Sequence, residues 1–330
     1  MSQKPLLQVK GLCVEFSTRK GNVQVLNHLD LHLDPGEALG IVGESGCGKS
    51  MTALSIMQLI PVPPGNISAG QILLNDTDLL QLSEKHMQDI RGNDISMIFQ
   101  EPMTSLNPVF TVGTQVSENI RRHQSATRAQ AREKTIQILE AVGIPVPELR
   151  IHQYPHELSG GMRQRVMIAM ALCCQPQILI ADEPTTALDV TIQAQIFDLL
   201  QKIQTEMGTA VILITHDMSV IAEFADRVVV MYAGSKVEEG MVRDIIDTPR
   251  HPYTQGLISC VPFLKKDPGT ERKELNEIPG MVPDMSQLGA GCSFAPRCDY
   301  VMEKCYLENP PEIQLGDNHY AHCWYVEEAK

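Results

Sequence analysis

The stretch GIVGESGCGKSMTAL, residues 40–54, places four glycines within nine positions, between an apolar run and a helix-like run. It fits the pattern G-x-x-x-x-G-K-S/T, in which Gly43 comes first and Ser50 last. EALGIVG before it is typical of a short buried strand and SMTALSIMQLI after it of a helix, which is the context the pattern requires. Because the N–H groups of such a loop point inward beside the positive end of the helix, the stretch predicts a polyphosphate-binding loop.

A glycine-rich turn that binds nothing is the alternative interpretation of this loop. A turn that only reverses the chain needs no Lys-Ser pair after its last glycine, so Lys49 and Ser50 favour phosphate binding. We expect Lys49 to neutralise β- and γ-phosphate oxygens and Ser50 to reach a magnesium ion. The thiol of Cys47 predicts inhibition by alkylating agents, which a bound nucleotide prevents. The residues expected to contact the nucleotide are Gly43, Glu44, Ser45, Gly46, Cys47, Gly48, Lys49, Ser50 and Met51.

Length and composition describe a folded globular protein. With 330 residues, of which 43% are hydrophobic, the chain can build one large domain and a smaller one. A formal net charge of −13 argues against a surface built for nucleic-acid phosphates. The longest apolar run, residues 166–174, is too short to span a membrane, and the N-terminus lacks the pattern of a secretory signal. We therefore expect a cytosolic protein, in which its nine cysteines favour metal or redox roles over disulfides.

Strands and helices alternate around the phosphate loop. Residues 7–33 read as two or three strands, residues 70–100 return to β character, and residues 110–165 follow a helical pattern. Further along, the apolar strands QILIADEP and AVILITHD are separated by an amphipathic helix. This order predicts a parallel sheet covered on both faces, with its ligand at the carboxyl ends of the strands.

The strand QILIADEP, residues 177–184, ends in two adjacent carboxylates. A strand that delivers Asp182 to the phosphate loop places it to hold Mg²⁺, directly or through water, and Glu183 can activate the attacking water. A solvated turn is the alternative interpretation of such a pair. Four apolar residues directly before the pair, together with the phosphate loop upstream, favour a functional site.

The segment ELSGGMRQR, residues 157–165, contains a second candidate anion site. Ser159, Gly160 and Gly161 open a helix, so a hydroxyl and backbone N–H groups are available there. An ordinary capped helix start is the alternative. The site is too far along the chain to be simply part of the phosphate loop.

Four cysteines lie in the last forty residues, within a proline-rich stretch that begins at about residue 250. Spacers of five, six and seventeen residues separate them. Four thiolates suit zinc or an iron–sulfur cluster, but this spacing matches neither the usual zinc pattern nor the common ferredoxin patterns. Four ordinary buried thiols are the alternative, and the other cysteines outside the phosphate loop are expected to fill the core. The four are Cys292, Cys298, Cys305 and Cys323, and the core candidates are Cys13, Cys173, Cys174 and Cys260.

Six short motifs follow one another along the chain. In their identity and order, residues 1 to about 240 resemble the nucleotide-binding subunit of an ABC transporter. The agreement of six motifs argues against chance similarity. The motifs are the phosphate loop at residues 43–50, Gln100 at the end of ISMIFQ, the signature at residues 158–162, Asp182 with Glu183, Asp189 in ALD, and His216 in LITHD.

The resemblance implies a role for each of these residues. Two subunits would face each other head to tail, with ATP held between the phosphate loop of one and Ser159, Gly160 and Gly161 of the other. Gln100 would sense the γ-phosphate and share Mg²⁺ with Ser50 and Asp182. Catalysis would fall to Glu183 as general base, His216 on the γ-phosphate and Gln100; Asp189 would signal across the dimer. Phe16 would stack on adenine; the alternative is that it is a core residue of a strand. For His216 the alternative is a structural histidine.

Longer phrases, among them FQEPMTSLNPVFTVG and HPYTQGL, look like the subunits that energise oligopeptide and dipeptide import. Nickel importers share much of this pattern. The resemblance implies two membrane permease subunits, a second, paralogous ATPase and an extracytoplasmic solute-binding protein as partners, and a peripheral position on the cytoplasmic face of the inner membrane. In relatives with this tail the four cysteines hold a four-iron, four-sulfur cluster, which the resemblance implies here.

The expected architecture is an α/β nucleotide-binding domain of the ABC type over residues 1–250, followed by a small loop-rich extension over residues 251–330. The domain would combine a phosphate-loop parallel sheet with an antiparallel β subdomain and a helical subdomain at about 101–165. The expected function is the ATP-hydrolysing motor of a peptide importer. A soluble ABC ATPase of DNA repair or translation would need a coiled-coil insertion or a second cassette, neither of which the sequence contains, and a cassette with a redox- or iron-sensing tail is a third possibility.

Overall fold

The computed structural model describes residues 4–19, 21–100, 105–186, 189–261 and 277–328. The chain divides into two compact units, each assembled from segments that are distant in sequence. The first unit comprises Met1–Leu6, Leu33–Ala38 and Asp78–Ile214, and the second comprises Leu7–His32, Leu39–Thr77 and Thr215–Lys330. The phosphate loop and the cysteine-bearing extension therefore belong to the same unit. The expected boundary near residue 250 and the helical subdomain at about 101–165 stay predictions.

Three parallel strands form the centre of the first unit. They are β6 (Ile95–Ile98), β7 (Ile178–Asp182) and β8 (Ala210–Ile214), hydrogen-bonded in that order, and all their residues are buried. Continuous apolar runs of this kind, without alternation, are typical of strands covered on both faces. The parallel sheet expected from the alternation of strands and helices is confirmed.

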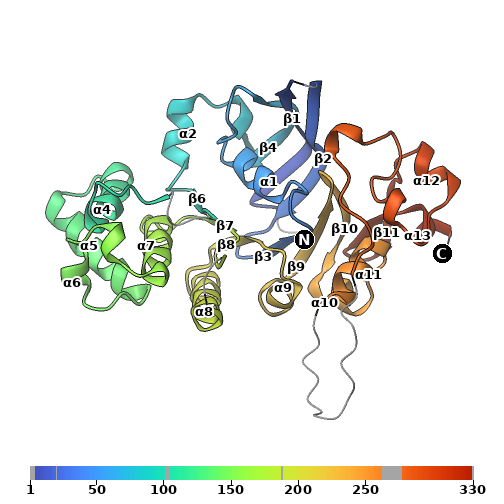
Figure 1. Ribbon diagram of the computed structural model, residues 1–330. Helices are drawn as coiled ribbons and strands as arrows, with labels where there is room; N and C mark the ends of the chain where they lie inside the picture. Colours follow the sequence, from blue (N-terminus) through green and yellow to red (C-terminus); the bar gives the residue numbers. More distant parts are fainter. Residues whose placement is uncertain (1–3, 20, 101–104, 187–188, 262–276, 329–330) are drawn as a thin grey trace, which may run out of the picture. The chain divides into compact units, whose positions relative to one another are not determined.

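A group of helices in the first unit lies together in Figure 1. Among them α4 (Val112–His123) packs against α5 (Arg128–Ala141) and α7 (Gly160–Leu172), and α7 also packs against β6. Thr127 begins α5 with a capping box, in which its side chain and that of Gln130 each accept a backbone N–H. The helical pattern expected for residues 110–165 is confirmed. The remaining helices of this unit are η1 (Leu79–Gln81), α2 (Glu84–Ile90), α6 (Pro147–Arg150), η2 (Pro155–Glu157) and α8 (Val190–Met207).

The β character expected for residues 70–100 is wrong in its middle part, where η1 and α2 separate β5 (Thr77–Asp78) from β6. Ser83 begins α2 as its N-cap and accepts the N–H of His86. Only Met87 of this helix is buried, so the sequence has no apolar periodicity that would indicate a helix.

An antiparallel sheet in the second unit has the strand order β2-β1-β4-β5. Strand β1 (Leu7–Thr18) runs antiparallel to β4 (Gly65–Leu74), so that Phe16 lies opposite Gly65. Strand β2 (Gly21–Leu33) follows β1 after a short turn. This arrangement confirms the expected antiparallel β part of the fold.

Five further strands of the second unit are hydrogen-bonded in the order β3-β9-β10-β12-β11. The first pair is parallel and the other pairs are antiparallel. The last two strands come from the C-terminal extension, which therefore continues this sheet instead of forming loops alone. The loop-rich composition of the extension gave no indication of this pairing. The strands are β3 (Ala38–Val42), β9 (Arg227–Tyr232), β10 (Ser235–Met241), β11 (Glu312–Gly316) and β12 (His319–His322).

A fully buried carboxylate joins the extension to this sheet. Glu238 in β10 accepts the backbone N–H groups of Arg250 and His251 at 2.7 and 2.9 Å. It also pairs with His319 Nε2 of β12 at 2.7 Å. One side chain thus satisfies three donors from separate segments, which is the condition for burying a carboxylate.

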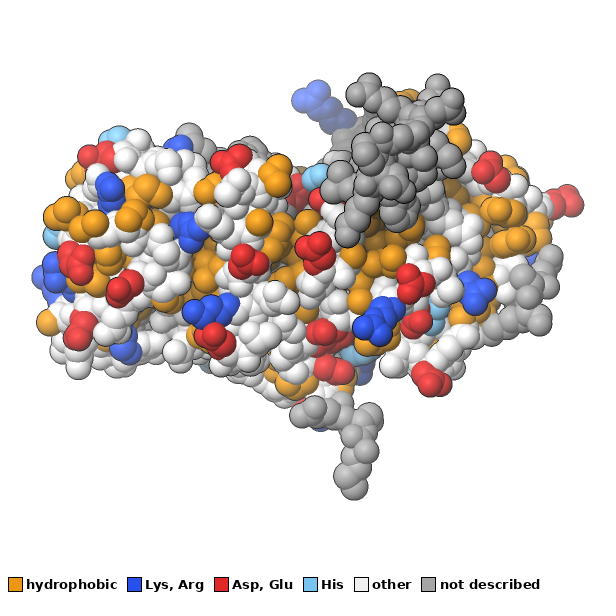
Figure 2. Space-filling view, turned by 90° about the horizontal axis from the view of Figure 1, so that it is seen from below, with side chains coloured by type: hydrophobic (Ala, Val, Ile, Leu, Met, Phe, Trp, Pro, Cys, Tyr) orange, Lys and Arg blue, Asp and Glu red, His pale blue; other side chains and the backbone are white. Residues whose placement is uncertain are grey.

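The rest of the second unit consists of short helices. No helix in the described part of the chain is long and apolar enough to cross a membrane. On the face seen in Figure 2, Lys and Arg side chains are interspersed with Asp and Glu. The helices are α1 (Lys49–Ile56), α9 (Met218–Phe224), α10 (Val242–Asp247), α11 (Pro252–Ser259), η3 (Met285–Gln287), η4 (Ala295–Arg297), α12 (Glu303–Leu307) and α13 (Trp324–Glu328).

Candidate functional site

The phosphate loop connects β3 to α1 in the second unit, and its glycines are required by the protein's own backbone. Gly43 has a φ of 151°, and a Cβ there would lie 2.2 Å from the carbonyl oxygen of Met231. Gly48 has a φ of 103°, and its Cβ would lie 2.8 Å from Leu26 Cδ2. Any side chain at either position would therefore displace the loop.

Lys49 is folded into the loop. Its side chain is buried, and Nζ donates to the carbonyl oxygens of Gly43 at 2.7 Å and Glu44 at 3.0 Å. Ser50 follows it in the first turn of α1 and is half-buried. The ammonium and the hydroxyl thus lie at the start of a helix, where backbone N–H groups also favour an anion.

Cys47 is fully buried within the loop. Burial raises the pKa of its thiol, and the nearby Lys49 ammonium offsets only part of that effect. Because the thiolate is the reactive form, this environment slows alkylation. Sequence pattern alone, which led us to expect a reactive thiol, contains no information on this burial.

Glu183 and Gln100 come together in the first unit. Glu183 Oε2 accepts a hydrogen bond from Gln100 Nε2 at 3.0 Å and another from Thr186 Oγ1 at 3.0 Å. Its backbone N–H donates to the carbonyl oxygen of Ile214, and its φ of 44° is unusual for a residue other than glycine. Asp182, directly before it, is buried at the end of β7.

Two helices hold the turn that follows Glu183. Gln164 of α7, which is buried, donates its side-chain amide to the carbonyl oxygen of Pro184. Gln193 of α8 donates to the carbonyl oxygen of Thr185 at 3.3 Å. The turn that positions the glutamate is therefore fixed from both sides by side chains that the sequence motifs did not identify.

The signature residues begin α7; Ser159 and Gly160 are exposed, Gly161 and Met162 are half-buried and Leu158 is buried. Ser159 is the N-cap and its Oγ accepts the N–H of Met162 at 3.3 Å, so the capped helix start is real. A Cβ at Gly161 would lie 3.2 Å from Ile192 of α8, which accounts for that glycine by packing. A Cβ at Gly160 would have nothing within 4 Å, so packing within this chain does not account for the first glycine.

Three further candidates are Asp189, His216 and Phe16. Asp189 is the N-cap of α8 and accepts the N–H of Ile192 at 3.0 Å, while the Ala-Leu pair before it lies outside the described residues. His216 is exposed, between the end of β8 and the start of α9. Phe16 is half-buried, and a Cβ on Gly65 would approach its ring to 3.0 Å. The ring of Phe16 therefore lies close to Gly65, its partner across the sheet.

Sequence analysis missed two residues that contact the phosphate loop. The backbone N–H of Glu44 donates to Tyr253 Oη at 2.8 Å. Arg297 forms a bidentate ion pair with the Glu44 carboxylate, at 2.7 Å to Oε2 and 3.1 Å to Oε1. Tyr253 lies in the HPYTQGL phrase and Arg297 lies between two of the candidate metal-binding cysteines, but neither position indicates a contact some 200 residues away along the chain.

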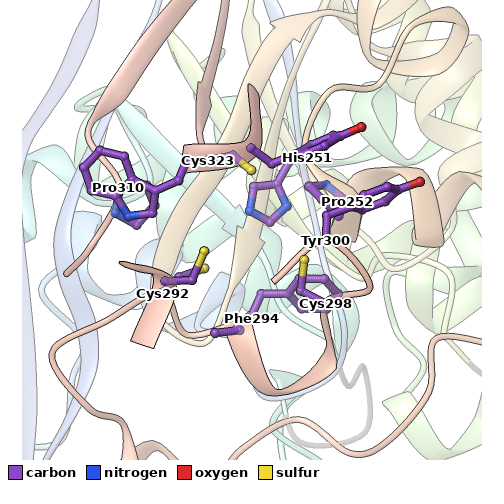
Figure 3. A pocket seen from close by; sticks show the side chains of 12 residues that line it. His251, Pro252, Cys292, Phe294, Cys298, Tyr300, Pro310 and Cys323 are labelled. Atoms are coloured by element: carbon purple, nitrogen blue, oxygen red, sulfur yellow. The ribbon is translucent and has the colours of Figure 1, made fainter. Parts of the chain in front are cut away.

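The four cysteines of the extension line one small cavity, together with apolar and aromatic side chains such as Phe294 and Trp324 (Figure 3). Burial raises the pKa of Cys292 to about 11, and the pKa values of Cys298 and Cys323 are also raised, mainly by burial. Among the described residues, no group of three or more His, Cys, Asp or Glu side chains is placed to bind one metal ion. The four thiols therefore share a cavity without converging on a single point.

The cysteines expected in the core agree with the structure in three of four cases. Cys13, Cys173 and Cys174 are buried, whereas Cys260 is half-buried at the end of α11. All nine cysteines are free thiols.

Two family models match parts of this chain. Residues 26–186 match the model described as ABC transporter, and residues 237–305 match the oligopeptide/dipeptide transporter C-terminal region. The first match contains the phosphate loop, the signature and Glu183; the second contains Tyr253 and Arg297.

Curated relatives are similar over nearly the full chain. A putative peptide import ATP-binding protein of Brucella ovis is 51% identical, with 98% of each chain covered. The oligopeptide transport ATP-binding protein of Bacillus subtilis is 51% identical over 97% of this chain and 89% of its own length. The dipeptide transport ATP-binding protein of the same organism is 50% identical over 98% and 95%.

Solved structures of similar cassettes agree with this fold. A bacterial ABC transporter cassette solved as a dimer is 28% identical, with a TM-score of 0.65, and the match covers 72% of this chain and 99% of that one. A post-hydrolysis dimer of the same cassette, bound to ADP and phosphate, matches equally well. Another match, at a TM-score of 0.63 and 27% identity, is the cbiO1 subunit of Clostridium perfringens, which covers 74% and 92%.

Proposed function

Since the chain belongs to the ABC transporter family, we propose that it is the ATP-hydrolysing motor subunit of an importer of oligopeptides or dipeptides. Similarity near 50% to peptide, oligopeptide and dipeptide transport ATP-binding proteins, over nearly the full chain, supports this cargo class. The match of residues 237–305 to a region specific to such transporters supports it independently of the cassette. Nickel or another small solute is the competing cargo.

The residues of the phosphate loop bind the nucleotide. Residues 43–50 offer backbone N–H groups to the phosphates, and Lys49 turns its ammonium from the loop carbonyls to the β- and γ-phosphate oxygens. Ser50, Gln100 and Asp182 supply the oxygen ligands that Mg²⁺ prefers. Phe16, which is half-buried at the end of β1, stacks on the adenine ring.

Hydrolysis depends on Glu183 as the general base. The hydrogen bond from Gln100 to its carboxylate is the observation that carries this assignment, because it fixes the base at the end of a buried strand. A residue that also contacts Mg²⁺ and the γ-phosphate would thereby couple nucleotide binding to the orientation of the base. His216, which is exposed after β8, contacts the γ-phosphate when two subunits close.

A second ATPase subunit completes the site. The signature of one subunit, Ser159 with Gly160 and Gly161, closes on the ATP held by the other. Gly160 supports this arrangement, because it is exposed and packing within this chain does not require a glycine there. ATP then joins two half-sites, and hydrolysis removes that bridge. Asp189 signals across the same contact.

The partners are two membrane permease subunits, a paralogous ATPase and an extracytoplasmic solute-binding protein, and the motor lies on the cytoplasmic face of the inner membrane. Purification of the tagged protein from a mild-detergent extract of its native membrane tests this assembly. Permeases, a second ATPase and a peptide-binding protein should be recovered with it. Recovery of the protein without any membrane partner would contradict the importer function.

We also propose that Cys292, Cys298, Cys305 and Cys323 hold a four-iron, four-sulfur cluster. All four thiols line one cavity with apolar walls. Cysteine thiolates are the ligands that such a cluster takes, so the residues present suit it. Such a cluster could supply electron transfer or hold the extension together.

The metal content of anaerobically purified protein tests the cluster assignment. We expect iron and acid-labile sulfide in equal amounts, both lost in Cys305→Ser and both retained in Cys260→Ser, which alters a half-buried cysteine outside the cavity. Zinc without sulfide, or no metal at all, would contradict the assignment.

A further inference from the structure

We propose that Arg297 of the C-terminal extension is a positioning residue for the phosphate loop, so that the affinity for ATP depends on the extension. The inference rests on ATP binding by the cassette, and the identity of the cargo does not enter it. It concerns a residue 253 positions away from the loop in sequence, yet in the same compact unit.

The ion pair between Arg297 and Glu44 has the geometry of a strong interaction. Both guanidinium nitrogens reach the carboxylate, at 2.7 and 3.1 Å. The Arg297 side chain is 5% exposed and that of Glu44 is 27% exposed. A planar, bidentate, largely buried pair holds both its partners in one orientation, which an exposed surface pair does not.

Arg297 is itself anchored on the side away from the loop. Its Nε donates to the carbonyl oxygen of Pro279 at 2.8 Å, and Nη2 donates to that of Ile278 at 3.2 Å. Nη1 also donates to Tyr232 Oη at 3.3 Å. The guanidinium therefore cannot follow Glu44 if the loop moves; it fixes the loop against the extension.

The loop residue Glu44 is held at both its ends. Arg297 fixes its carboxylate, and Tyr253 accepts its backbone N–H at 2.8 Å. Its carbonyl oxygen accepts a hydrogen bond from Lys49, the side chain that neutralises the phosphates. A displacement of Glu44 would therefore reach both the backbone of the loop and the ammonium of Lys49.

Electrostatics adds a second reason for the pair. A carboxylate within a loop that binds a polyphosphate opposes anion binding through like-charge repulsion. The Arg297 guanidinium neutralises Glu44 at short range. Loss of Arg297 would leave the charge of Glu44 uncompensated beside the nucleotide. Loss of the charges of both Arg297 and Glu44 would remove the repulsion between the carboxylate and the phosphates.

The same elements form one wall of the cysteine cavity. Phe294 lines the cavity and packs edge to face on Tyr232, with ring centroids 5.2 Å apart, and lies 5.4 Å from the ring of Tyr253. Arg297 directly precedes Cys298 in the sequence. The rings that contact Arg297 and Glu44 thus pack directly on a residue of the cavity wall. Packed side chains therefore connect the extension to the loop.

Equilibrium binding of MgATP to the purified full-length protein tests the proposal. Arg297→Gln should weaken binding about tenfold, the size expected for loss of a charge-assisted bidentate pair. The Michaelis constant for ATP should rise by a similar factor while kcat changes much less. The matched control is Arg243→Gln, which removes an exposed cation of α10 in the same unit and should bind MgATP as the unaltered protein does.

Glu44→Gln combined with Arg297→Gln separates positioning from general loss of structure. The double variant should bind MgATP more tightly than Arg297→Gln alone, because the uncompensated carboxylate is gone. Arg297→Lys keeps the charge but not the bidentate geometry, so its affinity for MgATP should lie between those of Arg297→Gln and the double variant. It also provides the test if Arg297→Gln does not fold. If the unaltered protein binds MgATP and either single Arg297 variant binds it within twofold of that affinity, the proposal is wrong and the proposed function stands. Failure of the unaltered protein to bind MgATP would overturn both.

Discussion

Gln100 donates its side-chain amide to the carboxylate of Glu183 at 3.0 Å, and this contact orients a glutamate that stands at the end of a buried strand with a positive φ. Thr186 donates to the same oxygen, so the carboxylate is fixed by two hydrogen bonds. A strained backbone held by its surroundings is characteristic of residues that take part in chemistry. The arrangement leads to two linked predictions about ATP hydrolysis.

Replacing Glu183 by glutamine should reduce the rate of ATP hydrolysis by roughly 100-fold or more, because a positioned general base contributes about 10²–10⁴-fold. MgATP binding should persist, since the phosphate loop is unaltered, and the variant should accumulate as an ATP-dependent dimer. Phosphate release and gel filtration with MgATP measure the two effects. Glu206→Gln, an exposed change in α8, serves as the control. Hydrolysis at the unaltered rate in Glu183→Gln would refute the assignment of the base.

Replacing Gln100 by alanine should lower kcat about tenfold, since Glu183 then loses one of its two orienting hydrogen bonds and the proposed Mg²⁺ site loses one ligand. The Michaelis constant for ATP should change less than kcat. In the Glu183→Gln background the same replacement should have little further effect on the residual rate, because the two residues act as a unit. Fully additive losses in the double variant would contradict the coupling.

The thiol of Cys47 should react slowly with iodoacetamide at neutral pH, because it is fully buried and its pKa is raised. The rate should increase as the pH rises and the thiolate forms. Bound MgATP should slow it further. Mass spectrometry of labelled peptides measures the rate, with the half-buried Cys260 as internal reference. Labelling of Cys47 ahead of Cys260 at neutral pH would contradict the burial of the loop.

The buried ion pairs around Glu239 should make stability depend on acid pH. Glu239 pairs with Arg227 and with Lys236, and Lys236 also pairs with Glu312 at 2.9 Å. Burial by itself raises the pKa of Glu239, but the attraction of Lys236 and Arg227 outweighs burial and holds it below the ordinary value of 4.5. The pair therefore stabilises the fold above about pH 4.5, and this stability is lost as the pH falls through the lower folded pKa.

Chemical denaturation across this pH range tests the effect of Glu239. Glu239→Gln should lower the free energy of unfolding by about 3 kcal/mol at pH 7, because it leaves the buried Arg227 without its carboxylate and leaves Lys236 with Glu312 alone. The difference between the variant and the unaltered protein should shrink below pH 4.5. Glu303→Gln, at the start of α12, is the exposed control. A difference that stays constant from pH 7 to pH 3 would show that the charge of Glu239 does not contribute.

The nucleotide motifs could be predicted from sequence because each is a short run in which backbone geometry and chemistry coincide. Gly43 is required by a close backbone approach and Gly48 by its positive φ, and Asp182 with Glu183 follows an apolar run typical of a buried strand. The apolar runs likewise predict β7 and β8 as buried strands. These signals are local, so one sequence suffices to find them.

The contacts between distant segments could not be predicted in this way. In the sequence Arg297 is an ordinary basic residue between two cysteines, and Glu238 is one of many acidic residues. Only the fold places Arg297 beside Glu44 and Glu238 beside His319. The helix α2 was not predicted because it buries a single residue, Met87, and so its sequence lacks the apolar periodicity of a helix. The burial of Cys47 likewise depends on packing that no local pattern records.

Uptake of a labelled oligopeptide by cells of the source organism tests the motor function most directly. Cells that carry Glu183→Gln should lose ATP-dependent uptake, while cells with the exposed control change Glu206→Gln should retain it, with both proteins present in equal amounts. Undiminished peptide uptake in the Glu183→Gln cells, or a loss confined to nickel uptake, would contradict the account of this protein as the motor of a peptide importer.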